Sequence, residues 1–245
     1  MPVRTVDSVD VNADVTVSDP AKMRSGAGYL CKLDCPHLQF PKMAIPWSIG
    51  VKSGLHGGPP NCKLALKFNA FKDDLTKSHK DLADFLDNLD ELAMAYIMEN
   101  KKVLFQKPKS DQVIRETFTR SIKEDINMKY TPTVSAKIDF DRRTEPKRTK
   151  TMDGDESDLS QQYLMKIGCF TRKGEQLLAE DVLAKDSEVQ AVITPRHIWV
   201  TTTGMGITYG ALRCVVNKRA TEDSGFDFDL SAIEDEGLGD GMPED

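Results

Sequence analysis

The chain has 245 residues, of which 39% are hydrophobic and 29% are charged, a composition typical of a globular protein with a sizeable core. No apolar run approaches the ~18–20 residues of a membrane span, and the amino terminus lacks the apolar stretch of a secretory signal. The five cysteines are an odd number, which indicates free thiols in a reducing compartment. We therefore expect neither a membrane partner nor a secreted disulfide scaffold.

The formal net charge of −6 hides an asymmetry along the chain. Residues 222–245 contain ten acidic residues and no basic residue. Because the whole chain carries −6 and this tail contributes ten negative charges, residues 1–221 carry a formal charge of +4. Such a division indicates a polyanionic ligand, an acidic interaction tail, or both. A tail that only improves solubility is the alternative.

The amino-terminal part of the chain is polar and carries few strong signals. Residues 1–28 predict a flexible arm, with a short strand near Asp10–Val17. Cys31, Cys35 and His37 lie close together, but structural zinc normally takes four ligands from two clusters. Buried free cysteines are the competing interpretation, and no metal or other cofactor is predicted.

Two segments with strand character follow. Lys42–Lys52 predicts an interrupted strand that contains Trp47. Lys63–Phe71 alternates between apolar and polar residues, and this period predicts a half-buried strand. Its outer face carries Lys63 and Lys67, which would either meet an anionic ligand or simply be solvated.

The clearest helix is predicted from about Ser78 to Asn100, because apolar residues recur there at three- and four-residue spacing. Ser78 is the expected N-cap. The apolar stripe should cover one face or one end of the sheet. The opposite face is predicted to be acidic and to avoid nucleic acid; it comprises Asp81, Asp84, Asp87, Asp90 and Glu91.

The middle of the chain predicts a short helix or extended piece over Asp111–Glu124 and then a strand over Thr133–Phe140, with Lys137 on its outer face. Residues 141–160 predict a mobile charged loop. Basic clusters on such loops suit phosphate backbones, and a solvated, self-neutralising linker is an equal alternative. The cluster contains Arg142, Arg143, Lys147 and Arg148.

The segment Ser187–Arg219 predicts three sequential antiparallel strands. Its apolar runs are rich in Val, Ile, Thr, Trp and Tyr, and two turn signals separate them. Trp199 and Tyr209 fall in adjacent predicted strands and so can share one face of the sheet. The three runs are Val189–Thr194, His197–Thr203 and Ile207–Asn217, divided by Pro195-Arg196 and by Gly204-Met205-Gly206.

No pattern of catalytic residues is found, so an enzyme is not predicted. None of the four histidines forms a zinc-protease motif, and the chain lacks a phosphate-binding glycine loop of the Walker type. Aromatic platforms beside a cationic groove are how proteins bind single-stranded nucleic acid without reading its sequence, although a core position is the competing interpretation for each aromatic. The candidate binding residues are Trp47, Lys63, Lys67, Lys137, Arg142, Arg143, Lys147, Arg148, Trp199, Tyr209 and Arg213.

The predicted fold is mainly β within the α+β class. A long helix among short strands is compatible with an elaborated five-stranded antiparallel barrel of the oligonucleotide-binding (OB) type over residues 29–219. Additional strands and a disordered acidic carboxyl-terminal tail over residues 220–245 complete the prediction.

Three segments carry a family resemblance: YTPTVSAKI at Tyr130–Ile138, then IGCFTRKGEQ, and then AVITPRHIWVTTTGMGITYGALRCVVNK, with the acidic tail after them. Together they resemble the carboxyl-terminal half of the single-stranded DNA-binding proteins of large eukaryotic DNA viruses, which are related to the replication single-stranded DNA-binding protein of short-tailed phages. The resemblance implies an OB barrel with an added helix, a groove for single strands, and a tail that competes for that groove and recruits replication proteins.

This chain departs from the phage relatives at its end, because Asp245 stands where they have an aromatic residue. Phe226 and Phe228 are internal and are predicted to form a docking peptide with Glu234, Asp235 and Glu236.

The resemblance predicts sequence-independent single-stranded DNA binding in viral replication, recombination and repair, in the host cytoplasm or nucleus, with packaging in the virion and a homodimer as further expectations. The alternative is a virion-associated or structural β-rich module that binds other proteins.

Overall fold

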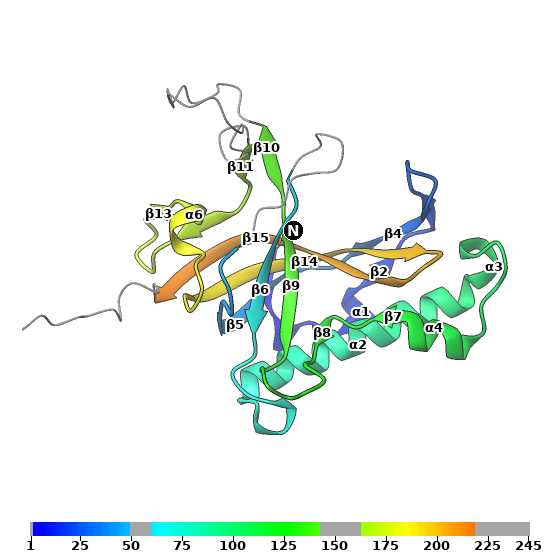
Figure 1. Ribbon diagram of the computed structural model, residues 1–245, viewed down its shortest axis with the longest axis horizontal. Helices are drawn as coiled ribbons and strands as arrows, with labels where there is room; N and C mark the ends of the chain where they lie inside the picture. Colours follow the sequence, from blue (N-terminus) through cyan, green and yellow to red (C-terminus); the bar gives the residue numbers. More distant parts are fainter. Residues whose placement is uncertain (1, 50–59, 143–162, 219–245) are drawn as a thin grey trace, which may run out of the picture.

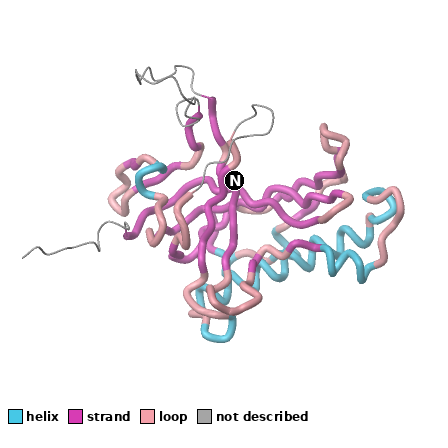
Figure 2. Tube along the Cα trace, in the orientation of Figure 1, coloured by secondary structure: helices cyan, strands magenta, loops and turns pink. Residues whose placement is uncertain are grey.

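The computed structural model describes residues 2–49, 60–142 and 163–218. Strands dominate the described part, and one long helix lies along one side of them (Figures 1 and 2). The mainly β fold class predicted from the sequence is therefore confirmed.

Five strands close into a barrel. Neighbouring strands around it pair antiparallel, except at the closing contact, where β15 runs parallel to β9. Around the barrel the strands follow each other in the order β5, β6, β9, β15, β14. If the five are numbered along the chain, this is the order one, two, three, five, four of the OB fold. The five are β5 (His37–Ala44), β6 (Cys62–Lys67), β9 (Thr133–Ile138), β14 (Glu188–Thr201) and β15 (Met205–Lys218).

The last two barrel strands correct the prediction of three strands. Pro195-Arg196 does not end a strand, because β14 continues through it with a shift of register between Pro195 and His197. A bulge tolerates proline, which cannot donate a ladder hydrogen bond. The chain turns only after Thr201, and Met205 already belongs to β15.

A salt bridge braces the seam where β15 meets β9. Arg196 donates to both carboxylate oxygens of Asp139, at 2.9 and 2.6 Å. To reach Asp139, the guanidinium of Arg196 passes directly over Gly210, where an added Cβ would overlap it. Gly210 pairs with Lys137 of β9 at this closing contact. The glycine therefore lets a charged side chain tie three barrel strands together.

Helix α2 (Lys77–Glu99) confirms the predicted long helix, although Thr76 rather than Ser78 is its N-cap residue. Its apolar stripe, which includes Leu82, Leu86 and Leu89, packs into the core. One correction concerns Asp90, which was expected on the acidic outer face but has no exposed surface.

The amino-terminal segment also differs from its prediction as a flexible arm. Four valines, at positions 6, 9, 11 and 15, are buried in the common core, and the Tyr96 hydroxyl of α2 donates to the Ser18 carbonyl at 2.8 Å. The spacing of these valines, two to four residues, follows neither a helical nor a strand period, so the sequence did not predict that this segment packs into the core. The elements here are β1 (Val3–Thr5), η1 (Val6–Ser8), α1 (Val11–Asp14), β2 (Thr16–Val17), β3 (Ala21–Lys22) and β4 (Gly28–Asp34).

All five cysteines are buried free thiols. Shorter elements connect and extend the barrel. Before β9 come η3 (Lys72–Asp74), α3 (Lys101–Leu104), α4 (Asp111–Thr117), β7 (Phe118–Thr119) and β8 (Ile122–Lys123). After β9 come β10 (Phe140–Arg142), β11 (Tyr163–Met165), β12 (Gly168–Phe170), β13 (Gln176–Leu177) and α6 (Ala179–Val182). Most of the predicted loop over 141–160 and the acidic tail lie outside the described residues.

Candidate nucleic-acid interface

A groove of about 350 Å³ crosses the outer surface of the barrel. It is lined by β6, β9, β14, β15 and by the β7–β8 segment, which runs beside them. The second and third barrel strands of an OB fold are β6 and β9 here, and they are the strands on which this fold binds oligonucleotides. We call this hollow the barrel groove.

The charge of the barrel groove is entirely positive among its described lining residues. Lys63 of β6 and Lys137 of β9 are exposed and stand directly opposite each other in the strand pairing. Like charges in directly opposed positions destabilise a sheet, and an anion between them removes that cost. Lys123 and Arg120 add two more positive charges from the β7–β8 segment, and Arg120 is also paired with Glu91 of α2 at 3.0 Å.

Trp199 forms the aromatic part of the barrel groove, and its half-buried ring rests on two glycines of the neighbouring turn and strand. A Cβ on Gly206 would lie 3.2 Å from the indole and 3.0 Å from the Thr119 carbonyl oxygen. A Cβ on Gly204 would lie 3.5 Å from the same ring. The glycines thus let the indole lie close to the strand, while its groove side remains available to stack on a base.

Tyr209 also lines the barrel groove, but it cannot serve as the stacking platform that the sequence suggested. Its side chain is 3% exposed, and its hydroxyl lies 2.5 Å from the Ser121 hydroxyl. Ser121 in turn donates its hydroxyl and its backbone N–H to the two oxygens of Asp90, at 2.6 and 2.8 Å. Tyr209 is therefore a floor residue, fixed to helix α2 through Ser121.

Burial governs the ionisation of this network. Loss of solvation raises the pKa of Asp90 to about 6, although hydrogen bonds from Ser121 and the nearby Arg120 act in the opposite direction. Burial also raises the pKa of Tyr209 well above its usual value. The tyrosine hydroxyl is thus neutral and acts as a hydrogen-bonding group rather than as a charge.

Of the other predicted residues, Trp47, Lys67 and Arg213 do not line the barrel groove. Trp47 is 53% exposed and follows β5, just before residues 50–59, which are not described. Lys67 lies half-buried at the far end of β6, and Arg213 packs over the Phe170 ring at 5.4 Å. Arg142 ends β10. Arg143, Lys147, Arg148, Phe226, Phe228, Glu234, Asp235 and Glu236 lie outside the described residues.

The β7–β8 segment contributes groove residues that the sequence did not identify. Thr119, Arg120, Ser121 and Lys123 belong to a piece of chain whose two strands are only two residues each. Such short strands carry no measurable alternation, because a period of two needs several residues to appear. The positive charges at Arg120 and Lys123 were the only local signal.

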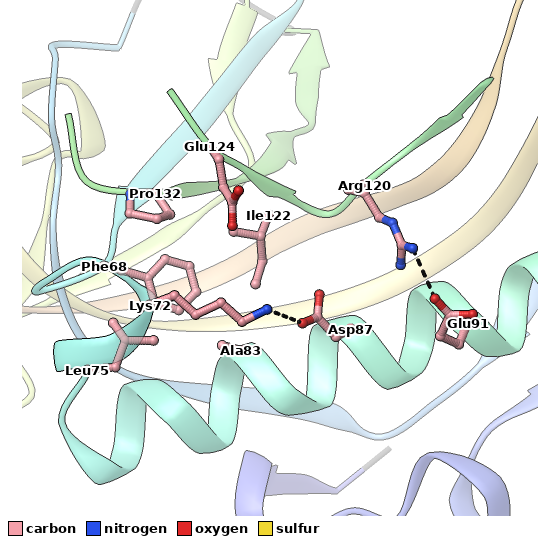
Figure 3. A pocket seen from close by; sticks show the side chains of 10 residues that line it. All are labelled: Phe68, Lys72, Leu75, Ala83, Asp87, Glu91, Arg120, Ile122, Glu124 and Pro132. Atoms are coloured by element: carbon pink, nitrogen blue, oxygen red, sulfur yellow. Dashed lines mark hydrogen bonds and ion pairs between the residues drawn. The ribbon is translucent and has the colours of Figure 1, made fainter. Parts of the chain in front are cut away.

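A second hollow, of about 510 Å³, lies between α2 and the β8–β9 connection (Figure 3). Its floor is apolar, and ion pairs join Lys72 to Asp87 at 3.3 Å and Arg120 to Glu91 at 3.0 Å across its walls. Glu124 adds a further negative charge. Because its cations are already paired and its acids outnumber them, this hollow suits a polyanion less well than the barrel groove does.

Comparisons with known proteins do not place the chain in a family. No family model matches, and no curated protein matches. Among solved structures, the chain is similar to gp2.5, a single-stranded DNA-binding protein encoded by bacteriophage T7, with 16% identity over 84% of this chain and 97% of that one, at a TM-score of 0.46. It is also similar to the single-stranded DNA-binding protein of bacteriophage Enc34 in complex with ssDNA, with 17% identity over 83% of this chain and 96% of that one, at a TM-score of 0.37.

These solved structures come from phages, so the resemblance to proteins of large eukaryotic DNA viruses stays a prediction.

Two further observations concern metal ions and membranes. Within residues 2–49, 60–142 and 163–218, no cluster of three or more His, Cys, Asp or Glu side chains could hold a metal ion. None of the described helices has the length and apolar character needed to cross a membrane.

Proposed function

We propose that this protein binds single-stranded DNA without reading its sequence, and that the barrel groove is the binding site. The observation that carries the proposal is the groove itself. Lys63, Lys137 and the Trp199 ring lie on the outer face of the OB strands, and Lys123 and Arg120 lie on the adjacent β7–β8 segment, where Arg120 also pairs with Glu91; no acidic residue lines the groove among those described. The hollow beside α2 lacks this combination, because its acids outnumber its cations.

Two kinds of contact hold the strand in the groove: stacking of a base and ion pairs with phosphates. One base stacks on Trp199, because every base offers a π-face and stacking therefore tolerates any sequence. The opposed pair Lys63 and Lys137 holds a phosphate, and Arg120 and Lys123 follow the backbone along the groove wall. Tyr209 and Ser121 form a polar floor held rigid by Asp90.

The proposal extends to the biological setting that the sequence resemblance implied. In it, the protein coats single strands during viral DNA replication, recombination and repair, in the host cytoplasm or nucleus. The acidic tail over residues 220–245 competes with DNA for the positive groove and recruits replication proteins, and the protein acts as a homodimer. The opposite charges of the body and the tail support this competition, since ten negative charges follow a body of formal charge +4.

Fluorescence titration tests the binding site directly. The chain has two tryptophans, so a W47F variant leaves Trp199 as the only indole. Titration with oligothymidylate should quench that indole, and the affinity should fall steeply with salt. Lys137→Ala should weaken binding, whereas Lys77→Ala, on the exposed first turn of α2, should not.

The same titration separates the proposal from a structural, protein-binding module. Ile126 and Met128 are 97% and 77% exposed, and such apolar side chains favour a protein contact elsewhere on the surface. A module of that kind would show no response to oligothymidylate at low salt and would form a stable oligomer in light scattering. That pair of results would refute the proposed function.

A further inference from the structure

A second positive hollow lies beyond the turn that joins β14 to β15. This cleft of about 590 Å³ is enclosed by the β3–β4 hairpin, by residues 102–109 and by the end of β14. Figure 1 shows α3 and the tips of these strands gathered at one end of the molecule. We call it the lysine cleft, after its four lysines: Lys22, Lys102, Lys107 and Lys109.

The lysine cleft carries unopposed positive charge. Its described lining residues include no aspartate or glutamate. Among the described residues, none of its four lysines is within ion-pair distance of a carboxylate. Lys22, Lys102 and Lys107 are exposed. Four cations gathered around one hollow repel each other, so the cleft is stabilised by any anion that enters it.

The lysine cleft is built on an anchored piece of chain rather than on a loose loop. Phe105 is buried and holds the segment against the body of the protein. Lys109 lies over the Phe105 ring at 5.2 Å and donates to the Thr202 carbonyl at 3.3 Å. Thr202 belongs to the β14–β15 turn, so the segment that supplies the lysines is fixed to that turn.

The same turn lies against Trp199, the aromatic residue of the barrel groove. The Trp199 ring packs against Gly204 on one side of the turn, while Lys109 binds Thr202 on the other. The chain itself connects the two hollows, because residues 102–109 lead through α4 directly into the β7–β8 segment of the barrel groove. A flexible strand that leaves Trp199 can therefore cross the turn and enter the lysine cleft.

We propose that the lysine cleft binds the phosphodiester backbone of nucleotides that emerge from the barrel groove, so that one single strand bends over the β14–β15 turn and occupies both hollows. This inference rests on the proposed function. The ligand must be single-stranded, because duplex DNA has a persistence length of about 150 base pairs and cannot bend over one turn at low cost. The lysine cleft thus adds affinity only to strands long enough to span both hollows.

Oligonucleotide length provides the test. The full chain and a Lys102→Ala/Lys107→Ala variant are titrated with oligothymidylates of about 5 and about 20 nucleotides. These lengths lie near the lower end and above the upper end of the site sizes of OB folds, which are about 4–16 nucleotides. A Lys77→Ala/Lys80→Ala variant removes the same charge from the exposed start of α2 and serves as the control. Each titration is repeated at several salt concentrations.

We expect the double variant to bind the short oligonucleotide as the wild type does and to bind the long one at least about threefold more weakly. The slope of log affinity against log salt should fall by about 1.4 for the long strand, since each lost phosphate contact removes about 0.7. Equal effects on both lengths, no effect on either, or the same loss in the control would overturn the inference. If the wild type binds neither oligonucleotide at low salt, the proposed function itself fails.

Discussion

Replacing Asp90 with asparagine isolates the cost of a buried charge beneath the barrel groove. Burial raises the pKa of Asp90 from 3.8 to about 6. The folded state therefore binds a proton more tightly than the unfolded state does, and stability falls as the pH rises from about 4 to about 6. A difference of this size corresponds to at most about 3 kcal/mol of unfolding free energy lost at neutral pH.

Asparagine resembles the protonated carboxyl, because its oxygen accepts from the Ser121 N–H and its amide group donates to the Ser121 hydroxyl. We expect D90N to match the wild type near pH 4 and to exceed its stability by up to about 3 kcal/mol at pH 7.5. Denaturant unfolding at several pH values measures the difference, in which contributions from all other titrating groups cancel.

D90A serves as the control for the hydrogen bonds alone. It leaves the buried Ser121 N–H without its acceptor. Because D90A and D90N both lack the titrating carboxyl, D90A should be about 1–3 kcal/mol less stable than D90N at both pH values. A stability difference between D90N and the wild type that stays constant from pH 4 to pH 7.5 would refute the reasoning. It would mean that Asp90 titrates alike in the folded and unfolded states.

Three further changes have defined outcomes. Arg196→Ala should lower the unfolding free energy by about 1–3 kcal/mol, because it removes the salt bridge that joins β14 to the end of β9. The Arg196 hydrogen bonds lower the pKa of Asp139, so the stability that this salt bridge adds to the wild type should be present above about pH 4 and should be lost as Asp139 is protonated in acid. Gly206→Ala should displace the Trp199 indole and weaken oligothymidylate binding several-fold; unchanged quenching would contradict this. Deleting residues 222–245 should tighten binding most at low salt, where loss of a competing polyanion matters most, and equal affinity of both forms would argue against competition.

The sequence predicts best where burial imposes a regular period over many residues. Helix α2 was found because its apolar residues repeat over 23 residues, and the faces of Lys63 and Lys137 followed from alternation along β6 and β9. The prediction failed at Pro195, where a local turn signal was overridden by pairing of β14 with partners on both sides.

The candidate site was predictable only in part. Lys63, Lys137 and Trp199 were named from sequence and do line one groove. Arg120 and Lys123 were not, because their two-residue strands show no period. Asp90 was assigned to the surface because it fits the acidic face of the helix, whereas Tyr209 was named as a candidate platform with a core position as the competing interpretation. The sequence contains no sign that Ser121 joins them.

By itself, the sequence determined the apolar faces of β6, β9 and the long helix, and that a positively charged body precedes a negative tail. Those properties are local, since they depend on the period of the backbone and on the sum of charges. Only the tertiary structure decided which positive residues meet. Closure of β15 onto β9 and the packing of α2 brought residues 63, 120, 137 and 199 together from four separate parts of the chain. Such neighbours depend on strand order and register, which contacts distant in sequence determine.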